Sequence, residues 1–264
     1  MKPSERLAQL QHDITEPFQP SMFSTSRLPV SLGPLNHTIG RLPSCLDMLI
    51  KLPKQDKIIP EPYQDDVGIR AFVEIAMMFE DKILPGWRDT HHLYLTVDQR
   101  IVKKDHTHRN AGWHFDGMQG TRHKTKLNAC HQYVLSTDLP TEFTSQPTNA
   151  MDLCEHKDNW FESLGAQVHD QNLWQPEPLE MVLMSAYQLH RSVQAPKDTP
   201  RTFLRLDVSL KQQDRLGNTE NPDLPAPWPF VERPMPPHLD RGVHDTGWEN
   251  EHAFETDKQH HGNR

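Results

Sequence analysis

The sequence has few features that would direct the chain to a membrane or to an oxidising compartment. No apolar run approaches the roughly 18 residues of a transmembrane helix. The N-terminal stretch MKPSERLAQLQHDITEPF has no apolar core of a signal peptide. The three cysteines, Cys45, Cys130 and Cys154, have no CxxC spacing, which disfavours a disulfide framework or a thiolate zinc site. We therefore expect a cytoplasmic protein with reduced thiols and no membrane partner.

The composition is that of a globular chain with an uneven distribution of charge. Its 264 residues can bury a sizeable core, and its net charge is −8. Residues 103–126 nevertheless contain six Lys or Arg against Asp105 and Asp116, a balance of +4. Such a basic segment can attract an anionic ligand, although a solvated loop explains it equally well. A chain this acidic, without a zinc-finger or helix-turn-helix pattern, is a poor general nucleic-acid binder.

Hydrophobic periodicity predicts helices first and strands afterwards. Short helices are expected at SERLAQLQHDI and at SCLDMLIKL, which ends before Pro53. The clearest helix is predicted at residues 65–84, where apolar side chains recur at helical spacing before Pro85 and Gly86, and it should pack flat against a sheet. Strands are predicted at HHLYLTVDQRIV, ACHQYVLSTDL, PLEMVLMSAYQLH and PRTFLRLDVSL, with a short extended piece at AGWHFDG.

This order of elements predicts a mainly β fold with flanking helices. Chains of this kind close as a β-sandwich or as a jelly roll with helices backing one sheet, and of these we expect a double-stranded β-helix core of the jelly-roll or cupin-like type, backed by N-terminal helices. Within one domain, residues 1–86 would form the helical portion, 87–215 the double-stranded β-helix core and 216–264 a proline-rich extension with a polar tail. The tail after about residue 240 is expected to be dispensable for chemistry, because it is polar and has no periodicity. The sequence carries no signal for an oligomeric state.

Three His-x-Asp triplets are candidates for a pair of metal ligands: His114–Asp116, His156–Asp158 and His238–Asp240. His156 lies in a polar loop, and His238 follows three closely spaced prolines. Only His114 lies in an apolar, glycine-bounded extended segment. Residues two apart in such a segment point to the same side, with Phe115 turned to the other. The first triplet is therefore the favoured site.

An open iron site needs a third protein ligand, and His190 is the best candidate. It ends the segment MVLMSAYQLH, 76 residues after His114. Arg201 follows 11 residues later, directly after Pro200. Two imidazoles and one carboxylate suit Fe(II) and leave coordination positions open for other ligands.

The segments WHFDG, SAYQLHRSV and PRTFLRLDVS, in this order, resemble the corresponding elements of the Fe(II)- and 2-oxoglutarate-dependent oxygenases. LSTDLPTEF is also similar to a segment that these enzymes often place after the His-x-Asp strand, and the resemblance covers roughly residues 90–212. It implies that His114, Asp116 and His190 bind Fe(II), with 2-oxoglutarate and O2 as cosubstrates. It also implies that Arg201 binds the far carboxylate of 2-oxoglutarate, as a forked guanidinium can.

One position departs from the family pattern. Many relatives have Ser or Thr two residues after the arginine, where this chain has Phe203. Arg205 shares the strand face of Arg201, so it is an alternative anchor, or else the partner of Asp207 in an ion pair. Tyr133 is expected to supply a hydroxyl to the cosubstrate site. Further candidates for the substrate pocket are Arg109, Trp113, Asn128, Gln132 and Tyr187.

The resemblance implies a dioxygenase that hydroxylates or otherwise oxidises a C–H bond. We expect a small polar or anionic metabolite as substrate, with a protein side chain or nucleic acid as alternatives. A second hypothesis is a cupin-like metal enzyme without 2-oxoglutarate, for which His106 and His108 would be extra ligands; we expect both in a loop that precedes the site instead. A third is a binding protein with a decayed site, against which the intact triad argues.

Overall fold

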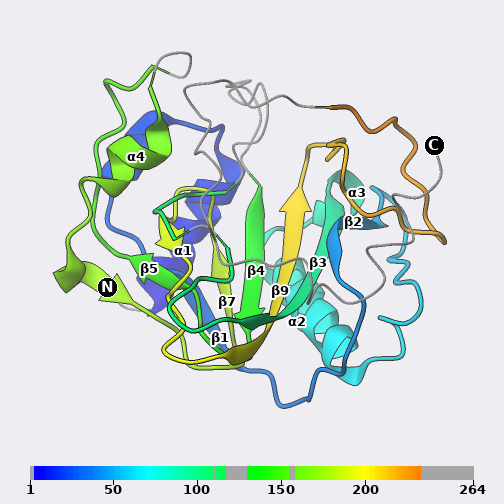
Figure 1. Ribbon diagram of the computed structural model, residues 1–264. Helices are drawn as coiled ribbons and strands as arrows, with labels where there is room; N and C mark the ends of the chain where they lie inside the picture. The colour runs from blue at the N-terminus through cyan, green and yellow to red at the C-terminus, as the bar shows by residue number, and fades with distance from the viewer. Residues whose placement is uncertain (1–2, 110, 117–129, 155–157, 233–264) are drawn as a thin grey trace.

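The computed structural model describes residues 3–109, 111–116, 130–154 and 158–232, which form a mainly β structure of two antiparallel sheets (Figure 1). Among these residues, the large sheet has the strand order β1–β7–β4–β9–β3–β2 and the small sheet β6–β5–β8. The large sheet comprises β1 (Val30–Pro34), β2 (Cys45–Lys51), β3 (His92–Val102), β4 (His131–Ser136), β7 (Glu180–Met184) and β9 (Thr199–Ser209). The small sheet comprises β5 (Glu142–Thr144), β6 (Leu173–Trp174) and β8 (His190–Arg191).

Two of the described helices have more than two turns, and the others are short. They are α1 (Pro3–Thr15), α2 (Val67–Ile83), α3 (Trp87–Thr90) and α4 (Trp160–Gly165), with 3₁₀ turns at Pro20–Ser24 and Asp170–Asn172. No helix in the described part of the chain has both the length and the apolar character required to span a bilayer.

From β3 onward the chain crosses repeatedly between the two sheets. After β3 in the large sheet, His114 forms a bridge to His190 of the small sheet, and the chain then returns to the large sheet as β4. Strands β5 and β6 belong to the small sheet, β7 to the large, β8 to the small and β9 to the large. The facing surfaces are joined by an apolar cluster in which Val134 and Phe203 of the large sheet pack with Phe143 of the small one. The predicted metal ligands lie between these two layers.

Helix α2 covers the opposite face of the large sheet, as its periodicity predicts (Figure 1). Asp66 caps its N-terminus, where the carboxylate accepts a hydrogen bond from the backbone N–H of Ile69 at 2.8 Å. The apolar stripe of the helix, which includes Phe72 and Val73, is buried with Leu95 and Leu206 of the sheet. This packing leaves the other face of β4, β9 and β3 for the site.

Two sequence-based expectations about the elements are wrong. The segment SCLDMLIKL is strand β2, not a helix, so residues 1–86 contribute strands β1 and β2 as well as helices. A short apolar run fits a buried strand and a buried helix equally well, and pairing with β3 decides between them. The segment PLEMVLMSAYQLH is not one strand, because it crosses from β7 in the large sheet to β8 in the small one.

The described part of the proline-rich extension packs against the edge of the large sheet. Leu224 is buried against Leu49 and Tyr94, and Ala226 and Trp228 pack on the same cluster. The Asn221 amide donates hydrogen bonds to the carbonyls of Leu49 and Ile58, at 2.8 and 2.9 Å. This segment is therefore part of the folded core, and the strand that it secures is β2.

Ending the chain after Arg215 is expected to destabilise the protein. Loss of the burial of Leu224 and Trp228 should cost about 3 kcal/mol, which corresponds to a fall in melting temperature of about 6–12 °C. Thermal unfolding followed by circular dichroism measures the effect. A chain that ends after Glu232 is the matched control and should melt like the full protein. Equal melting temperatures for all three proteins would contradict the packing role of the extension.

Candidate metal centre

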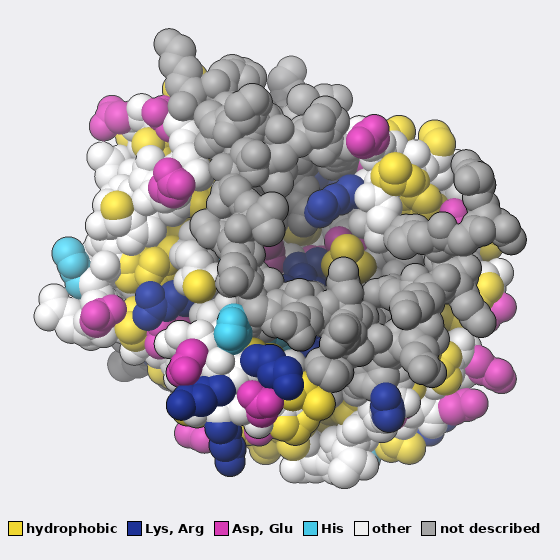
Figure 2. All heavy atoms as spheres, viewed as in Figure 1, with side chains coloured by type: hydrophobic (Ala, Val, Ile, Leu, Met, Phe, Trp, Pro, Cys, Tyr) yellow, Lys and Arg dark blue, Asp and Glu magenta, His cyan; other side chains and the backbone are white. Residues whose placement is uncertain are grey.

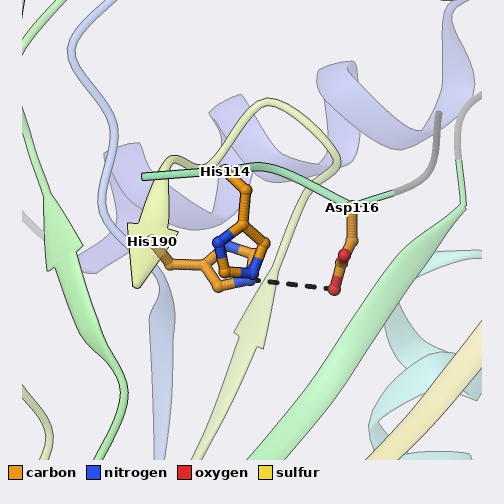
Figure 3. A group of neighbouring side chains, drawn as sticks. All are labelled: His114, Asp116 and His190. Atoms are coloured by element: carbon orange, nitrogen blue, oxygen red, sulfur yellow. Dashed lines mark ion pairs between the residues drawn. The ribbon is translucent and has the colours of Figure 1, made fainter. Parts of the chain in front are cut away.

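His114, Asp116 and His190 come together between the two sheets, as the sequence predicts. Each offers one ligand atom, and these atoms all lie within 4.8 Å of one another. The two imidazoles and the carboxylate point toward one another from two different segments (Figure 3). Nε2 of His190 lies 3.7 Å from Oδ2 of Asp116. This group is the one cluster of potential metal ligands found in the described residues.

The two histidines are brought together by a local backbone pairing. The N–H of His114 donates to the carbonyl of His190, and the N–H of His190 donates to the carbonyl of His114, both at 2.9 Å. Residues opposite each other in an antiparallel pair project their side chains to the same side. The ring centroids accordingly lie 4.3 Å apart.

Phe115 orients the segment that carries the first two ligands. Its ring is buried on the other side from the triad, where it packs against Phe23 and Phe161 at centroid distances of 4.8 and 5.0 Å. Because side chains alternate along an extended segment, burial of Phe115 turns His114 and Asp116 together toward the space between the sheets. This is the orientation expected from the sequence.

Hydrogen bonds to backbone carbonyls place a proton on the same ring nitrogen of both histidines. Nδ1 of His114 lies 2.9 Å from the carbonyl of Gly112, and Nδ1 of His190 lies 3.0 Å from that of Gln188. A carbonyl oxygen only accepts, so Nδ1 carries the proton in each case. A neutral ring in this tautomer has its lone pair on Nε2, the form in which histidine binds a metal.

Asp116 is held in its charged form. Burial acts to raise its pKa, but the guanidinium of Arg205 and the two imidazoles act more strongly together and bring the pKa below its ordinary value. Nη1 of Arg205 lies 3.3 Å from Oδ2 of Asp116. An ionised carboxylate and two imidazoles that bind through Nε2 are the donor set of an open Fe(II) site. The residues present therefore fit such an ion.

The other potential ligands lie elsewhere. His106 and His108 are in the loop that follows β3, and neither belongs to the triad cluster. Nδ1 of His106 bonds to the carbonyl of Lys104, and Nε2 of His108 lies 3.2 Å from the carboxylate of Asp98. Asp158 of the second triplet accepts a backbone hydrogen bond from Cys154. His156, His238 and Asp240 lie outside the described residues.

Arg201 is a buried cation without a carboxylate partner in the described residues. It is 3% exposed and lies on the face of β9 that looks between the sheets. Its Nε donates to the carbonyls of Asp138 and Leu139, and Nη2 donates to Oγ of Ser136 at 2.8 Å. Burial, and then the nearby Arg109, lower the pKa of Arg201. A buried guanidinium without a carboxylate partner is electrostatically suited to bind an anion.

Arg205 is in the opposite situation, because three carboxylates surround it. It contacts Asp116, Asp47 and Asp207, with Nε at 3.1 Å from Oδ2 of Asp207. The ion pair with Asp207, one of the alternatives raised by the sequence, is therefore present. Burial acts to lower the pKa of Arg205, and the carboxylates together raise it well above its ordinary value.

The face of the molecule that holds these residues is hollowed near its centre, over β4 and β9, and basic and acidic side chains lie inside the hollow (Figure 2).

The described part of the basic segment, residues 103–126, contributes less free charge than the sequence suggests. Lys103 pairs with Asp198 at 3.2 Å, and Arg109 pairs with Asp98 at 3.0 Å. The three basic residues of this segment that follow residue 116 lie outside the described residues.

Tyr133 does not face the site, and the expectation that it contributes a hydroxyl there is wrong. Its ring is buried with the core on the α2 side, and its hydroxyl donates to Oε2 of Glu80 at 2.6 Å. A shift of one residue along a strand reverses the face, so Gln132, Val134 and Ser136 are the residues of β4 that look between the sheets. The hydroxyl beside Arg201 belongs to Ser136.

Replacing Tyr133 with phenylalanine tests this correction. Loss of the buried hydrogen bond to Glu80 should lower the free energy of unfolding by about 1–3 kcal/mol. Denaturant titration measures that loss. Binding of 2-oxoglutarate should be unchanged, because the side chain lies on the far side of the sheet. A large loss of 2-oxoglutarate binding in a folded Tyr133→Phe protein would restore the original expectation.

The remaining candidates for the substrate pocket have different surroundings. Tyr187 packs between Phe18 and Phe23 in a core cluster, and its hydroxyl accepts the N–H of Gln19, so it is structural. Trp113 lies under the guanidinium of Arg191, 4.5 Å from its ring centroid. Gln132 is buried beside the site and donates to Asp207. Asn128 lies outside the described residues.

Sequence reasoning missed Asp47 and Ser136. Asp47 reaches the site from β2 and contacts Arg205. Its signal was a lone acidic residue within the apolar run SCLDMLIKL, which a buried strand would not contain without a partner. Ser136 follows Gln132 and Val134 at period two along β4, so correct assignment of the face would have found it.

No family model matches the sequence, and a comparison with curated proteins gives no match. Among solved structures, the fold is similar to that of EvdO2 from Micromonospora carbonacea var. aurantiaca, whose crystal structure contains 2-oxoglutarate. The two proteins share 11% sequence identity, and the alignment covers 64% of this chain and 67% of EvdO2 with a TM-score of 0.38. A similarity this distant assigns no function, so the functional argument is based on the residues of the site.

Proposed function

We propose that the protein is an Fe(II)- and 2-oxoglutarate-dependent dioxygenase. The observation that carries the proposal is the convergence of His114, Asp116 and His190 with both Nδ1 atoms bonded to backbone carbonyls. This arrangement offers two Nε2 lone pairs and one ionised carboxylate from the protein and leaves further positions on a bound ion open. When bound, the iron centre supplies the oxidation of a C–H bond by O2, coupled to decarboxylation of 2-oxoglutarate.

The chain's own residues would hold the cosubstrate through Arg201. Arg201 is the buried arginine that has no carboxylate partner in the described residues, whereas three carboxylates already surround Arg205. A dicarboxylate needs a cationic partner at the end remote from the metal, and a guanidinium can donate two parallel hydrogen bonds to it. Ser136, already bonded to Arg201, takes the hydroxyl role that Tyr133 was expected to fill.

The strand order supports a double-stranded β-helix for residues 87–215. Strands β3, β4, β7 and β9 lie in one sheet, and β5, β6 and β8 lie in the other with the His114 segment beside β8. Alternation of this kind is how two Greek keys form a jelly roll. In this arrangement the triad comes from the small-sheet side and both arginines come from the large sheet.

We propose a small polar or anionic metabolite as the substrate. The surface of the large sheet beside the triad carries polar and charged side chains, where Asp207 contacts both Gln132 and Arg205. Oε1 of Gln132 is buried and has no hydrogen-bond partner in the described residues, so it can accept from a polar ligand. A large apolar substrate would leave these groups unpaired.

Anaerobic addition of Fe(II) and then 2-oxoglutarate tests the proposal directly. Chelation of Fe(II) by a 2-oxo acid should produce a visible charge-transfer absorption band. Glutarate is the matched control, because it has the same carbon chain and both carboxylates but no 2-oxo group, and it should produce no band. If the protein binds Fe(II) but 2-oxoglutarate produces no band, the cupin-like alternative replaces the proposal. If it binds no Fe(II), the metal centre itself is refuted.

A further inference from the structure

A buried charge cluster such as the one around Arg205 need not add to the stability of the fold. One guanidinium is buried with the carboxylates of Asp47, Asp116 and Asp207, and all four side chains are largely shielded from water. Replacing such a cluster by apolar side chains of similar volume is commonly neutral or stabilising. Burial raises the pKa of Asp207, which shows how unfavourable the environment is for a further negative charge. We therefore looked to the contacts of Arg205 for a function of this cluster other than packing.

Asp47 is delivered to Arg205 by an irregularity in β2. The pairing of β2 with β3 shifts register between Cys45 and Met48, and Asp47 adopts a left-handed conformation with φ of 47°. This conformation is uncommon for residues other than glycine, and bulges of this kind re-aim a side chain. Two hydrogen bonds with Thr96 hold Asp47: its N–H donates to Oγ1 at 3.0 Å, and Oγ1 donates to Oδ1 at 3.1 Å.

Arg205 joins this fixed carboxylate to the metal ligand. Its Nη2 donates to Asp47, and its Nη1 lies 3.3 Å from Asp116. Asp116 belongs to the segment that pairs with the small sheet, whereas Arg205 belongs to β9 of the large sheet. The guanidinium thus links the ligand segment to the opposite layer. A planar fork holds two acceptors in one fixed geometry, which an ammonium cannot do.

Each of the three potential ligands consequently has an outer partner, that is, a group that hydrogen-bonds to the ligand and does not itself bind the metal. Backbone carbonyls orient His114 and His190, and Arg205 orients Asp116. Outer partners of this kind commonly set metal affinity and ligand geometry. We propose that Arg205 is a positioning residue that holds the Asp116 carboxylate for the metal through the fork it shares with Asp47. The inference rests on the proposed metal centre and is separate from the binding of 2-oxoglutarate.

Arg205→Lys tests the inference, because it keeps the charge and removes the fork. Titration of the full chain with Co(II), followed by its visible absorption, measures metal affinity and ligand geometry without turnover. The dissociation constant for Co(II) should rise about 10- to 100-fold, and the absorption envelope should change. Thr96→Val, an uncharged change that loosens Asp47, should weaken Co(II) binding in the same direction by a smaller factor. It also keeps the test decisive if Arg205→Lys does not fold.

Arg201→Lys is the matched control on the same strand face. It should leave the affinity for Co(II) and the absorption envelope unchanged, since its contacts are to Ser136 and backbone carbonyls. Wild-type affinity and spectrum in folded Arg205→Lys or, if that variant does not fold, in Thr96→Val would overturn the inference and leave the proposed function standing. Failure of the wild-type protein to bind Co(II) would overturn both.

Discussion

Replacing Asp116 with alanine is expected to abolish turnover and to weaken metal binding by more than about 100-fold. Loss of a residue that only hydrogen-bonds to a metal ligand costs up to about 100-fold, and loss of the ligand itself should cost more. The carboxylate is the one anionic group of the triad, and its pKa lies below the ordinary value in the folded chain. Arg205 keeps Asp47 and Asp207 as partners in the variant, so no buried cation is left unpaired. Co(II) titration measures the loss of metal binding.

The apo form of Asp116→Ala should melt close to the apo wild type. Asp116 contacts Arg205 at the site and does not belong to any of the apolar clusters. The matched comparison is Asp158→Ala, from the second His-x-Asp triplet, which should retain full metal affinity. A collapse of the apo melting temperature in Asp116→Ala would show that the carboxylate is chiefly structural.

Replacing Arg201 with alanine is expected to remove most of the affinity for 2-oxoglutarate. Loss of the cationic half of a buried guanidinium–carboxylate pair costs roughly 3–5 kcal/mol. Because each 1.4 kcal/mol is a factor of ten, the concentration of 2-oxoglutarate required should rise by about two to three decades or more. Titration of the charge-transfer band with 2-oxoglutarate at saturating Fe(II) measures this, and the affinity for the metal should change little.

Arg100 provides a matched control for this experiment. It lies opposite Arg201 in the pairing of β3 with β9, but it is already paired with Asp98 at 2.6 Å. Arg100→Ala should shift the requirement for 2-oxoglutarate by no more than about threefold, because a partly exposed ion pair is worth little. If Arg201→Ala binds 2-oxoglutarate as the wild type does, Arg201 is not the anchor. If Arg205→Lys loses 2-oxoglutarate at saturating metal instead, the assignment of the two arginines is reversed.

The sequence by itself identified the three side chains that the structure brings together as potential metal ligands, and the order in which they occur. The His114 triplet was distinguished from the other two by its apolar, glycine-bounded context, and alternation correctly placed Phe115 on the other side. The helix at residues 65–84 followed from a long and regular apolar period. These features are local. A spacing of two or of 3.6 residues between side chains on one face can be read from the sequence without knowing which segment packs against that face.

The tertiary structure decided which side of each strand faces the site. Alternation divides β4 into two sets of side chains, but only the packing of α2 shows that Tyr133 belongs to the core and Ser136 to the site. The run SCLDMLIKL was short enough to fit either element, and only pairing with β3 made it strand β2.

The tertiary structure also separated the two arginines. Arg201 and Arg205 share one face of β9, so their sequence positions describe them as equivalents apart from spacing. Asp47 and Asp116, which are distant in sequence, meet at Arg205, whereas Arg201 is left among carbonyls and a hydroxyl. The role of a buried charge depends on the charges that other segments bring to it, and such long-range contacts leave no periodic signal in the sequence.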